Sequence, residues 1–548
     1  MSQPIPKVQK ALVLQGGGAL GAYEAGVFKT LYNRFIKPSN KAFDIIAGVS
    51  IGAVNASILV NHVIHNNNRW DHAVETLDGF WNSVSSSPTI YDPLSWPLYL
   101  LDNNPMLKRW FAYQDFFRKA LEQYYSYFTE STKIMWQQEW PYIPIWRRED
   151  GSVINWISWK ENWREELPYI LSYFLNWPDN YGTVASSEAV RRYYSWKHFL
   201  LTGTPNVYTP FISQPDLRFF DMFSFYFPYN PYSILYRIGN EPLVRTIKNY
   251  WYPNAPPIKT SLDAKQPRLL LVSVDIQNGT STTFDSYEKG KDEDGDAICR
   301  TVYGEDKTKY TIEYPEGIGM EHLDTSMAFH LRHKYPELDV KKVGKSNSNS
   351  RPFWDGIYLS NTPLRELLQA YRDYWVKVRK LEDGIPKLQV FIVDLFPTAE
   401  KGTPEGFDEI NDRQYDILFH DKTKYDEKVA HMVTDYVNIG KEMSKLLEDA
   451  INTIKDSDKK KALQKEYHEF LHSKAKSMTR DGKERIYDDL LKGHFEVEVI
   501  RIERSEDHNT DIYGKAFDFS RNTIEKLKEE GEKDTENILN NKYSNLSW

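Results

Sequence analysis

The chain has 548 residues, with 69 basic and 77 acidic side chains and a net charge of −8. Hydrophobic residues make up 41% and charged residues 27%, a balance that excludes a wholly disordered chain and is typical of globular proteins. This mild acidity gives no electrostatic reason to expect a nucleic-acid partner, and the single Cys299 excludes a disulfide within the chain.

The N-terminus and the hydropathy pattern bear on where the protein acts. The first apolar run is short and leads into glycines rather than into a small-residue cleavage site, which is unlike a secretory signal. No uninterrupted apolar stretch reaches the ~20 residues that a membrane-spanning helix needs. We therefore expect a cytoplasmic protein, whose contact with any membrane is peripheral.

Residues 11–64 predict a repeated unit of strand, turn and helix. Ala11–Leu14 and Phe43–Ala47 are short apolar runs of the kind found in buried strands, and glycines follow each of them. Tyr23–Phe35 has apolar residues at helical spacing, and Ile51–Val63 reads as a helix of small residues. The repetition predicts a parallel sheet covered by helices.

Residues 91–256 differ in composition, because Trp, Tyr, Phe and Pro crowd together around positions such as Trp136 and Trp140. Pro105–Phe128 is one expected helix, and we interpret the whole segment as an inserted cap. Such a cap is either a packed helical subdomain with its own aromatic core or a lid that shapes an acyl-chain pocket or touches a bilayer. The two interpretations are compatible.

Two further buried strands are expected at Arg268–Asp275 and Leu388–Leu395. The C-terminal region is charged and mainly helical, with an alternating strand at Phe495–Arg501 and a helix over Asn522–Asn540 that Ser520 caps. The predicted organisation comprises a first part of the core, the cap, a second part of the core and the C-terminal region, at residues 8–90, 91–256, 257–400 and 401–548.

A glycine-rich segment follows the first strand and opens a helix. Its residues, Gly16-Gly17-Gly18-Ala19-Leu20-Gly21, satisfy G-x-G-x-x-G through Gly16, Gly18 and Gly21. With Asp44 where a ribose-binding acid could sit, the segment is compatible with a dinucleotide site. Free N–H groups at a helix start equally suit a phosphate or the oxyanion of a tetrahedral intermediate.

The pentapeptide Gly48-Val49-Ser50-Ile51-Gly52 lies between the second strand and its helix. It matches G-x-S-x-G, the nucleophile elbow, in which a tight turn exposes a serine hydroxyl and small neighbours relieve crowding. The motif alone is also compatible with a structural turn. Its position about thirty residues after a glycine-rich N–H loop, at the end of the adjacent predicted strand, favours a catalytic Ser50.

A serine nucleophile needs a base, and the segment Asp355-Gly356-Ile357 provides a candidate in Asp355. Asp-Gly by itself is usually a turn. The residues that follow, Ser360-Asn361-Thr362-Pro363, favour a catalytic Asp355, because they match the family described next.

Together these segments resemble the patatin-like phospholipases, which combine a glycine-rich oxyanion loop, G-x-S-x-G and a distant Asp-Gly-Gly or Asp-Gly-Ala. The resemblance covers residues 8–64 and 268–396. It extends to the flanking residues, which are Ala22–Val27, Asn55-Ala56, Val274-Asp275, Asn278-Gly279 and Ser360–Pro363. Phe517–Arg521 resembles the C-terminal region of a bacterial branch with longer chains.

The resemblance implies a Ser50–Asp355 dyad with no catalytic histidine, no metal and no cofactor, and an oxyanion hole at Gly16, Gly17 and Gly18. It implies a three-layer α/β/α core with a mostly parallel sheet. The inserted aromatic-rich helical cap and the helical C-terminal region are predicted from position and composition. The implied reaction is hydrolysis of acyl esters of phospholipids or other glycerolipids. The chain departs from the family at Ile357, usually a small residue, and at Thr325–His330, which lacks the usual proline; in the family both segments line the site.

Three alternatives stay open on the sequence. The chain could be a lipid-binding protein that keeps the fold without useful turnover, or a dinucleotide-dependent oxidoreductase. It could also be a serine hydrolase with a conventional triad, for which six histidines follow the aspartate: His420, His431, His468, His472, His494 and His508.

Overall fold

The computed structural model describes residues 5–39, 42–86, 238–251 and most of 257–546, together with isolated positions between 192 and 210. Most of the predicted cap lies outside the described residues, including Pro105–Phe128, Trp136 and Trp140. Its last described part, helix α12 (Glu241–Tyr250), packs against α4 (Ala73–Val84), where the Tyr250 hydroxyl donates to the carbonyl oxygen of Gly79 at 2.6 Å.

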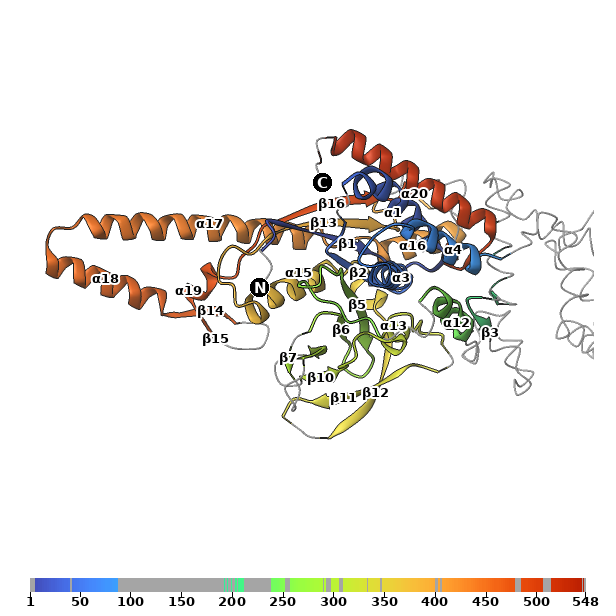
Figure 1. Cartoon of the computed structure of the whole chain (residues 1–548), viewed down its shortest axis with the longest axis horizontal. Helices are drawn as coiled ribbons and strands as arrows, with labels where there is room; N and C mark the ends of the chain where they lie inside the picture. The colour runs from blue at the N-terminus through green and yellow to red at the C-terminus, as the bar shows by residue number, and fades with distance from the viewer. Residues whose placement is uncertain are drawn as a thin grey trace, which may run out of the picture.

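A ten-stranded sheet runs through the centre of the described structure (Figure 1). Five neighbouring strands run parallel to one another, in the order β16 (Val497–Glu503), β13 (Lys387–Asp394), β1 (Val8–Leu14), β2 (Ile45–Val49) and β5 (Arg268–Asp275). The predicted strand Arg268–Asp275 is confirmed residue for residue, and the other three predicted core strands and Phe495–Arg501 lie within three residues of their observed bounds.

Beyond β5 the sheet becomes antiparallel. The extension consists of β12 (Ser348–Asp355), β11 (Glu337–Lys342), β10 (Tyr310–Glu313) and β9 (Arg300–Tyr303), while β6 (Thr280–Asp285) pairs with β5 off this path. Strand β12 therefore ends beside the carboxyl end of β5, and its last residue, Asp355, is level with Ser273.

Helices cover both faces of the parallel strands. On β1, Leu12 and Leu14 point into a core cluster with α1 (Gly21–Leu31), α3 (Ile51–His65) and α20 (Arg521–Lys542). Ala11 and Val13 point into a second cluster with α15 (Leu364–Asp373) and the π-helical turn after it. Successive strand residues thus alternate between two helical layers, which confirms the three-layer α/β/α fold.

Close contact between α1 and α20 brings the C-terminal end of the chain onto the core. A methyl group on Gly26 would lie 2.0 Å from the carbonyl oxygen of Lys528, and one on Gly531 would lie 2.2 Å from that of Tyr23. Only residues without a Cβ atom allow this approach. Ser520 precedes α20 as its N-cap residue, in agreement with the predicted helix start.

The rest of the C-terminal region is mainly helical, as predicted. Its elements are α16 (Phe407–Phe419), α17 (Lys424–Thr453), α18 (Ser457–Leu471), β14 (Lys474–Met478), β15 (Glu484–Ile486) and α19 (Tyr487–Leu491). Helices α17 and α18 form a hairpin that projects away from the sheet (Figure 1). Among the described residues no helix combines the length and apolarity needed to cross a membrane.

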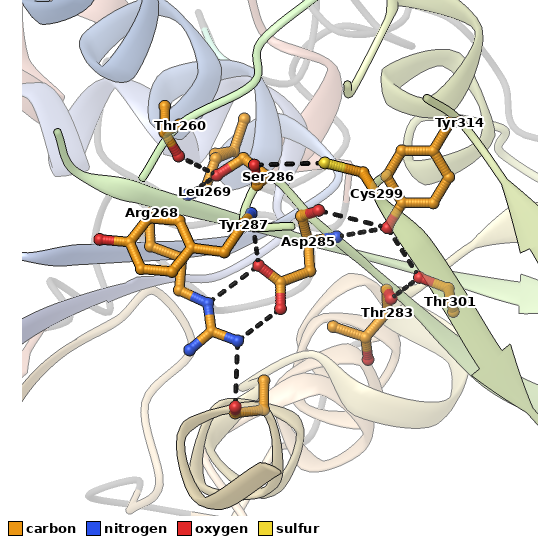
Figure 2. Close-up of polar contacts among 11 residues, drawn as sticks. Thr260, Arg268, Leu269, Thr283, Asp285, Ser286, Tyr287, Cys299, Thr301 and Tyr314 are labelled. Atoms are coloured by element: carbon orange, nitrogen blue, oxygen red, sulfur yellow. Dashed lines mark hydrogen bonds and ion pairs between the residues drawn. The ribbon is translucent and has the colours of Figure 1, made fainter. Parts of the chain in front are cut away.

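A buried ion pair joins the sheet to the helical layer below it (Figure 2). Arg268, at the start of β5, donates from Nε to Asp285 Oδ1 at 2.9 Å and from a terminal nitrogen to the carbonyl oxygen of Ala370 in α15 at 3.0 Å. Both charged side chains are at most 1% exposed. Because the charges are desolvated and fully paired, loss of either partner is expected to destabilise the fold strongly.

Candidate active site

Ser50 occupies a strained turn between β2 and α3. Its backbone has φ 54° and ψ −123°, which is unusual for a residue with a side chain. A methyl group on Gly48 would lie 2.3 Å from the carbonyl oxygen of Gly52, and one on Gly52 would lie 2.5 Å from that of Gln15. The two glycines are therefore required by close backbone approach, as expected for a nucleophile elbow.

Asp355 lies at the end of β12, with its side chain 2% exposed. The Ser50 side chain lies beside its carboxylate, and the backbone N–H of Ile357 donates to Oδ1 at 3.0 Å. Burial raises the pKa of Asp355 to about 7, and the Ser50 side chain and the Ile357 N–H oppose this rise. The structure thus brings together a serine and a carboxyl group whose pKa suits a general base near neutral pH.

The glycine loop follows β1 and passes directly beside Ser50. A methyl group on Gly16 would lie 2.8 Å from the Ser50 Cβ atom. The N–H of Gly16 donates to Asn361 Oδ1 at 2.9 Å, so this donor is already used. Gly18 has φ 57° and begins a short 3₁₀ turn that continues into α1. Gly17 and Gly18 are therefore the remaining backbone donors at the end of the loop nearest the helix start.

The segment that departs from the family pattern, Thr325–His330, supports both candidate catalytic residues. The Ser326 hydroxyl accepts a hydrogen bond from the backbone N–H of Ser50 at 3.2 Å and donates to the carbonyl oxygen of Val272 at 2.7 Å. The carbonyl oxygen of Ala328 accepts from the backbone N–H of Asp355 at 2.9 Å. The segment therefore fixes the backbone on either side of the Ser50–Asp355 contact.

Ser326 and Asn361 were not assigned roles from the sequence. Asn361 bridges two loops, because it accepts from Gly16 and donates from Nδ2 to the carbonyl oxygen of Phe419 at 2.7 Å. Both residues lie in segments, Thr325–His330 and Ser360–Pro363, that the family resemblance places beside the site. This proximity was the only sign in the sequence of a role for them, because Gly16 and Ser50, which they contact, lie hundreds of residues away in the chain.

A family comparison covers the first half of this site. The model described as patatin-like phospholipase matches residues 12–175, which include the glycine loop, Ser50 and α3. This part of the chain is similar to the patatin-like phospholipases. Asp355 lies after the matched residues, but β12 places it in the same sheet as the matched part.

One solved structure is also similar to this chain, but its similarity is low. VipD from Legionella pneumophila is similar at a TM-score of 0.28 and 11% sequence identity, over 98% of this chain and 67% of that one. No curated protein matches the chain.

The dinucleotide interpretation places Asp44 near the glycine loop, and the structure does not. Asp44 precedes β2, where its carboxylate accepts from the backbone N–H of Lys10 at 2.7 Å. The glycine loop follows the carboxyl end of β1, and β1 and β2 are parallel. Asp44 therefore lies at the amino ends of the parallel strands, whereas the glycines lie at their carboxyl ends, and the two cannot bind the same ligand.

The triad interpretation requires a histidine beside Asp355. No described histidine hydrogen-bonds to Asp355 or Ser50; His508 lies outside the described residues. His431 and His472 instead contact backbone carbonyl oxygens of the C-terminal region. His420 contacts those of Asp416 and Ile417, and it lines a small pocket beside Ile357 and Tyr358. Within the described part of the chain, no cluster of His, Cys, Asp and Glu could hold a metal ion.

Proposed function

We propose that this protein is a serine acyl hydrolase acting on lipid esters, with Ser50 as nucleophile and Asp355 as base. The observation that carries the proposal is the close approach of the Ser50 side chain to the buried Asp355 carboxylate, at a strained elbow beside a glycine loop. The similarity to the patatin-like phospholipases supports lipid esters as the substrate class.

In the proposed reaction Asp355 accepts the Ser50 proton while the Ser50 oxygen attacks the ester carbonyl carbon. Backbone N–H groups of Gly17 and Gly18 donate to the oxyanion, and each such donor is worth about 3 kcal/mol. As the tetrahedral intermediate collapses, the C–O bond to the alcohol breaks and Asp355 returns the proton to the leaving oxygen. Water, deprotonated by Asp355, then attacks the acyl-enzyme, and Ser50 recovers its proton as the carboxylic acid leaves.

Each site residue has a separate function in this mechanism. The turn at Ser50 projects the hydroxyl toward Asp355, and the Ser326 contact holds the Ser50 backbone. Burial keeps the Asp355 pKa high enough for the carboxylate to accept a proton from the hydroxyl. Because Gly16 donates to Asn361, we assign the oxyanion hole to Gly17 and Gly18, a narrower set than the three glycines that the sequence suggested.

One observation favours a second candidate, a lipid-binding protein without useful turnover. The Ile357 side chain extends over the glycine loop, and its Cδ1 atom would lie 3.4 Å from a methyl group on Gly16. A large residue there narrows the space in which a substrate carbonyl must fit. Ile357→Gly separates the candidates: if wild type is inactive and this variant hydrolyses esters, steric blockage by Ile357 is the cause.

The proposed function is tested by Ser50→Ala measured with a short and a long acyl ester. We expect activity to fall to background, since no other group replaces the hydroxyl, while circular dichroism shows an unchanged fold. Ser57→Ala is the matched control, because the buried Ser57 hydroxyl of α3 has no hydrogen-bond partner among the described residues. Near-normal activity in Ser50→Ala would contradict the assignment.

A further inference from the structure

A groove of about 980 Å³ lies in the C-terminal region, away from Ser50. It is formed where α17, α18 and α19 meet α15 and β16, and we call it the C-terminal groove. Its volume is at the upper end of the range for small-molecule sites, which is about 300–1,000 Å³. Its lining is mostly apolar, and includes Leu368, Val429, Val433, Met443, Leu447 and Phe470.

The apolar lining of the C-terminal groove is open to solvent. Met443 is 65% exposed and Phe470 is 60% exposed, although both are large hydrophobic residues. Val433 and Leu447 on the same face of α17 are also exposed. A contiguous apolar surface of this kind is uncommon on a protein that binds nothing there. The groove therefore suits an apolar ligand.

Two arginine side chains line the groove near each other. Arg372 of α15 and Arg485 of β15 both line it, and neither forms a salt bridge within the described residues. Burial lowers the pKa of Arg372, and repulsion by Arg485 lowers it further. By contrast, Lys492 at the same groove pairs with Glu382 at 3.1 Å and with Asp488 at 2.8 Å. The unpaired arginines provide a site for an anionic group.

His494 lies near these cations but adds no positive charge, because its pKa below the ordinary value leaves the imidazole neutral at pH 7. It lines the groove, its Nε2 atom is buried without a hydrogen-bond partner in the described structure, and Arg372 and Lys441 both lower its pKa after burial. Asp426 is the one carboxylate among the described groove residues, and it lies with Arg365 at the end shared with the small pocket beside Ile357. The groove is therefore cationic near Arg372 and Arg485, and near Arg365 it adjoins the small pocket beside Ile357.

We propose that the C-terminal groove binds a long-chain carboxylate, with the alkyl chain along α17 and the carboxylate on Arg372 and Arg485. The apolar lining selects a chain, and paired guanidinium groups match the geometry of a carboxylate. The choice of a fatty acid among anionic amphiphiles rests on the proposed function, since this is the product of acyl-ester hydrolysis. The shared residues Arg365 and Asp426 connect the groove to the small pocket beside Ile357.

The test is calorimetric titration of full-length Ser50→Ala protein with laurate below its micelle-forming concentration. We expect one saturable site, and no comparable binding of dodecyltrimethylammonium, which has the same chain with a cationic head. Arg372→Gln combined with Arg485→Gln should weaken laurate binding by about tenfold or more. Met443→Asp should weaken it as well, since it places a carboxylate on the apolar wall.

Lys445→Gln combined with Lys461→Gln is the matched control, because both lysines are exposed, lie on α17 and α18, and do not line the groove. This control makes the same change in net charge and should leave binding unchanged. The proposal is overturned if laurate does not saturate, if the arginine variants bind it normally, or if the cationic analogue binds equally well. It is also overturned if sedimentation shows that a second copy covers the groove and Met443→Asp dissociates the pair.

The outcome is independent of the proposed catalysis, because Ser50→Ala lacks the proposed nucleophile. If wild type hydrolyses no ester, the proposed function fails, while laurate binding that depends on Arg372 and Arg485 would still support the groove. If wild type is active and laurate does not bind, only the groove proposal fails.

Discussion

The pKa of Asp355 predicts how esterase activity should depend on pH. In the proposed mechanism Ser50 loses its proton only to an ionised Asp355, and burial raises the pKa of this carboxyl to about 7. The ionised fraction is then roughly one tenth at about pH 6 and roughly nine tenths at about pH 8, so kcat/KM should rise about tenfold between them. An aspartate with an ordinary pKa would be fully ionised across this range and would give a flat profile.

The assay is kcat/KM for an uncharged short acyl ester, followed at a wavelength where product ionisation does not alter the signal. A histidine base would also titrate near neutrality, so the profile is repeated at a second temperature. The ionisation of a carboxyl group changes little with temperature, whereas that of an imidazole shifts clearly. A flat profile, or an inflection that moves with temperature and is lost in His420→Ala, would refute the Ser–Asp dyad.

Four further predictions concern the Asp355 carboxyl, the buried ion pair, the glycine loop and the aromatic segment. Asp355→Asn should abolish activity, but at about pH 8 it should raise the free energy of unfolding by up to about 4 kcal/mol. Between about pH 4 and about pH 7, Asp355 is protonated in the folded wild type and ionised in the unfolded chain. The stability of the wild type therefore falls as pH rises through this window, whereas the asparagine does not titrate. Chemical denaturation at two pH values measures this; equal stability of the two proteins at both would contradict it. Asp285→Ala should cost about 3–5 kcal/mol by leaving Arg268 buried and unpaired, against under about 1 kcal/mol for Glu484→Ala in the exposed pair with Lys474. Similar losses in the two variants would show that burial of the pair is unimportant. Gly16→Ala should lower kcat by about a hundredfold in folded protein, because its methyl group displaces Ser50; wild-type kcat would show that the loop adjusts. Trp136→Ala and Trp140→Ala should slow hydrolysis of long-chain esters more than short-chain ones if the aromatic segment is a lid, and an unchanged chain-length profile would count against it.

Local patterns were sufficient for the core of the fold. The apolar runs that became β1, β2, β5 and β13 are continuous because parallel strands are buried on both faces, which makes them easy to recognise. The antiparallel extension was not predicted. Strands β11 and β12 contain mostly polar residues and few apolar alternations, so their pairing with β5 and β10 determines their structure.

Only those residues of the candidate site that lie in sequence motifs could be predicted from the sequence. The structure places Ser50, Asp355 and the glycine loop next to one another, and their catalytic roles stay a prediction. Ser326 was missed because its contact with Ser50 joins two distant segments, and Gly16 was counted as an oxyanion donor because its bond to Asn361 depends on the tertiary fold. Such contacts have no signature in local sequence.

The proposed Ser50–Asp355 dyad is tested by labelling with a fluorophosphonate, which reacts only with an activated serine. Peptide mass spectrometry of the labelled wild type should place the adduct on Ser50, and Asp355→Asn should lose the label while staying folded. The account would be contradicted if Ser50 in folded wild-type protein is not labelled, or if labelling of Ser50 is undiminished in Asp355→Asn.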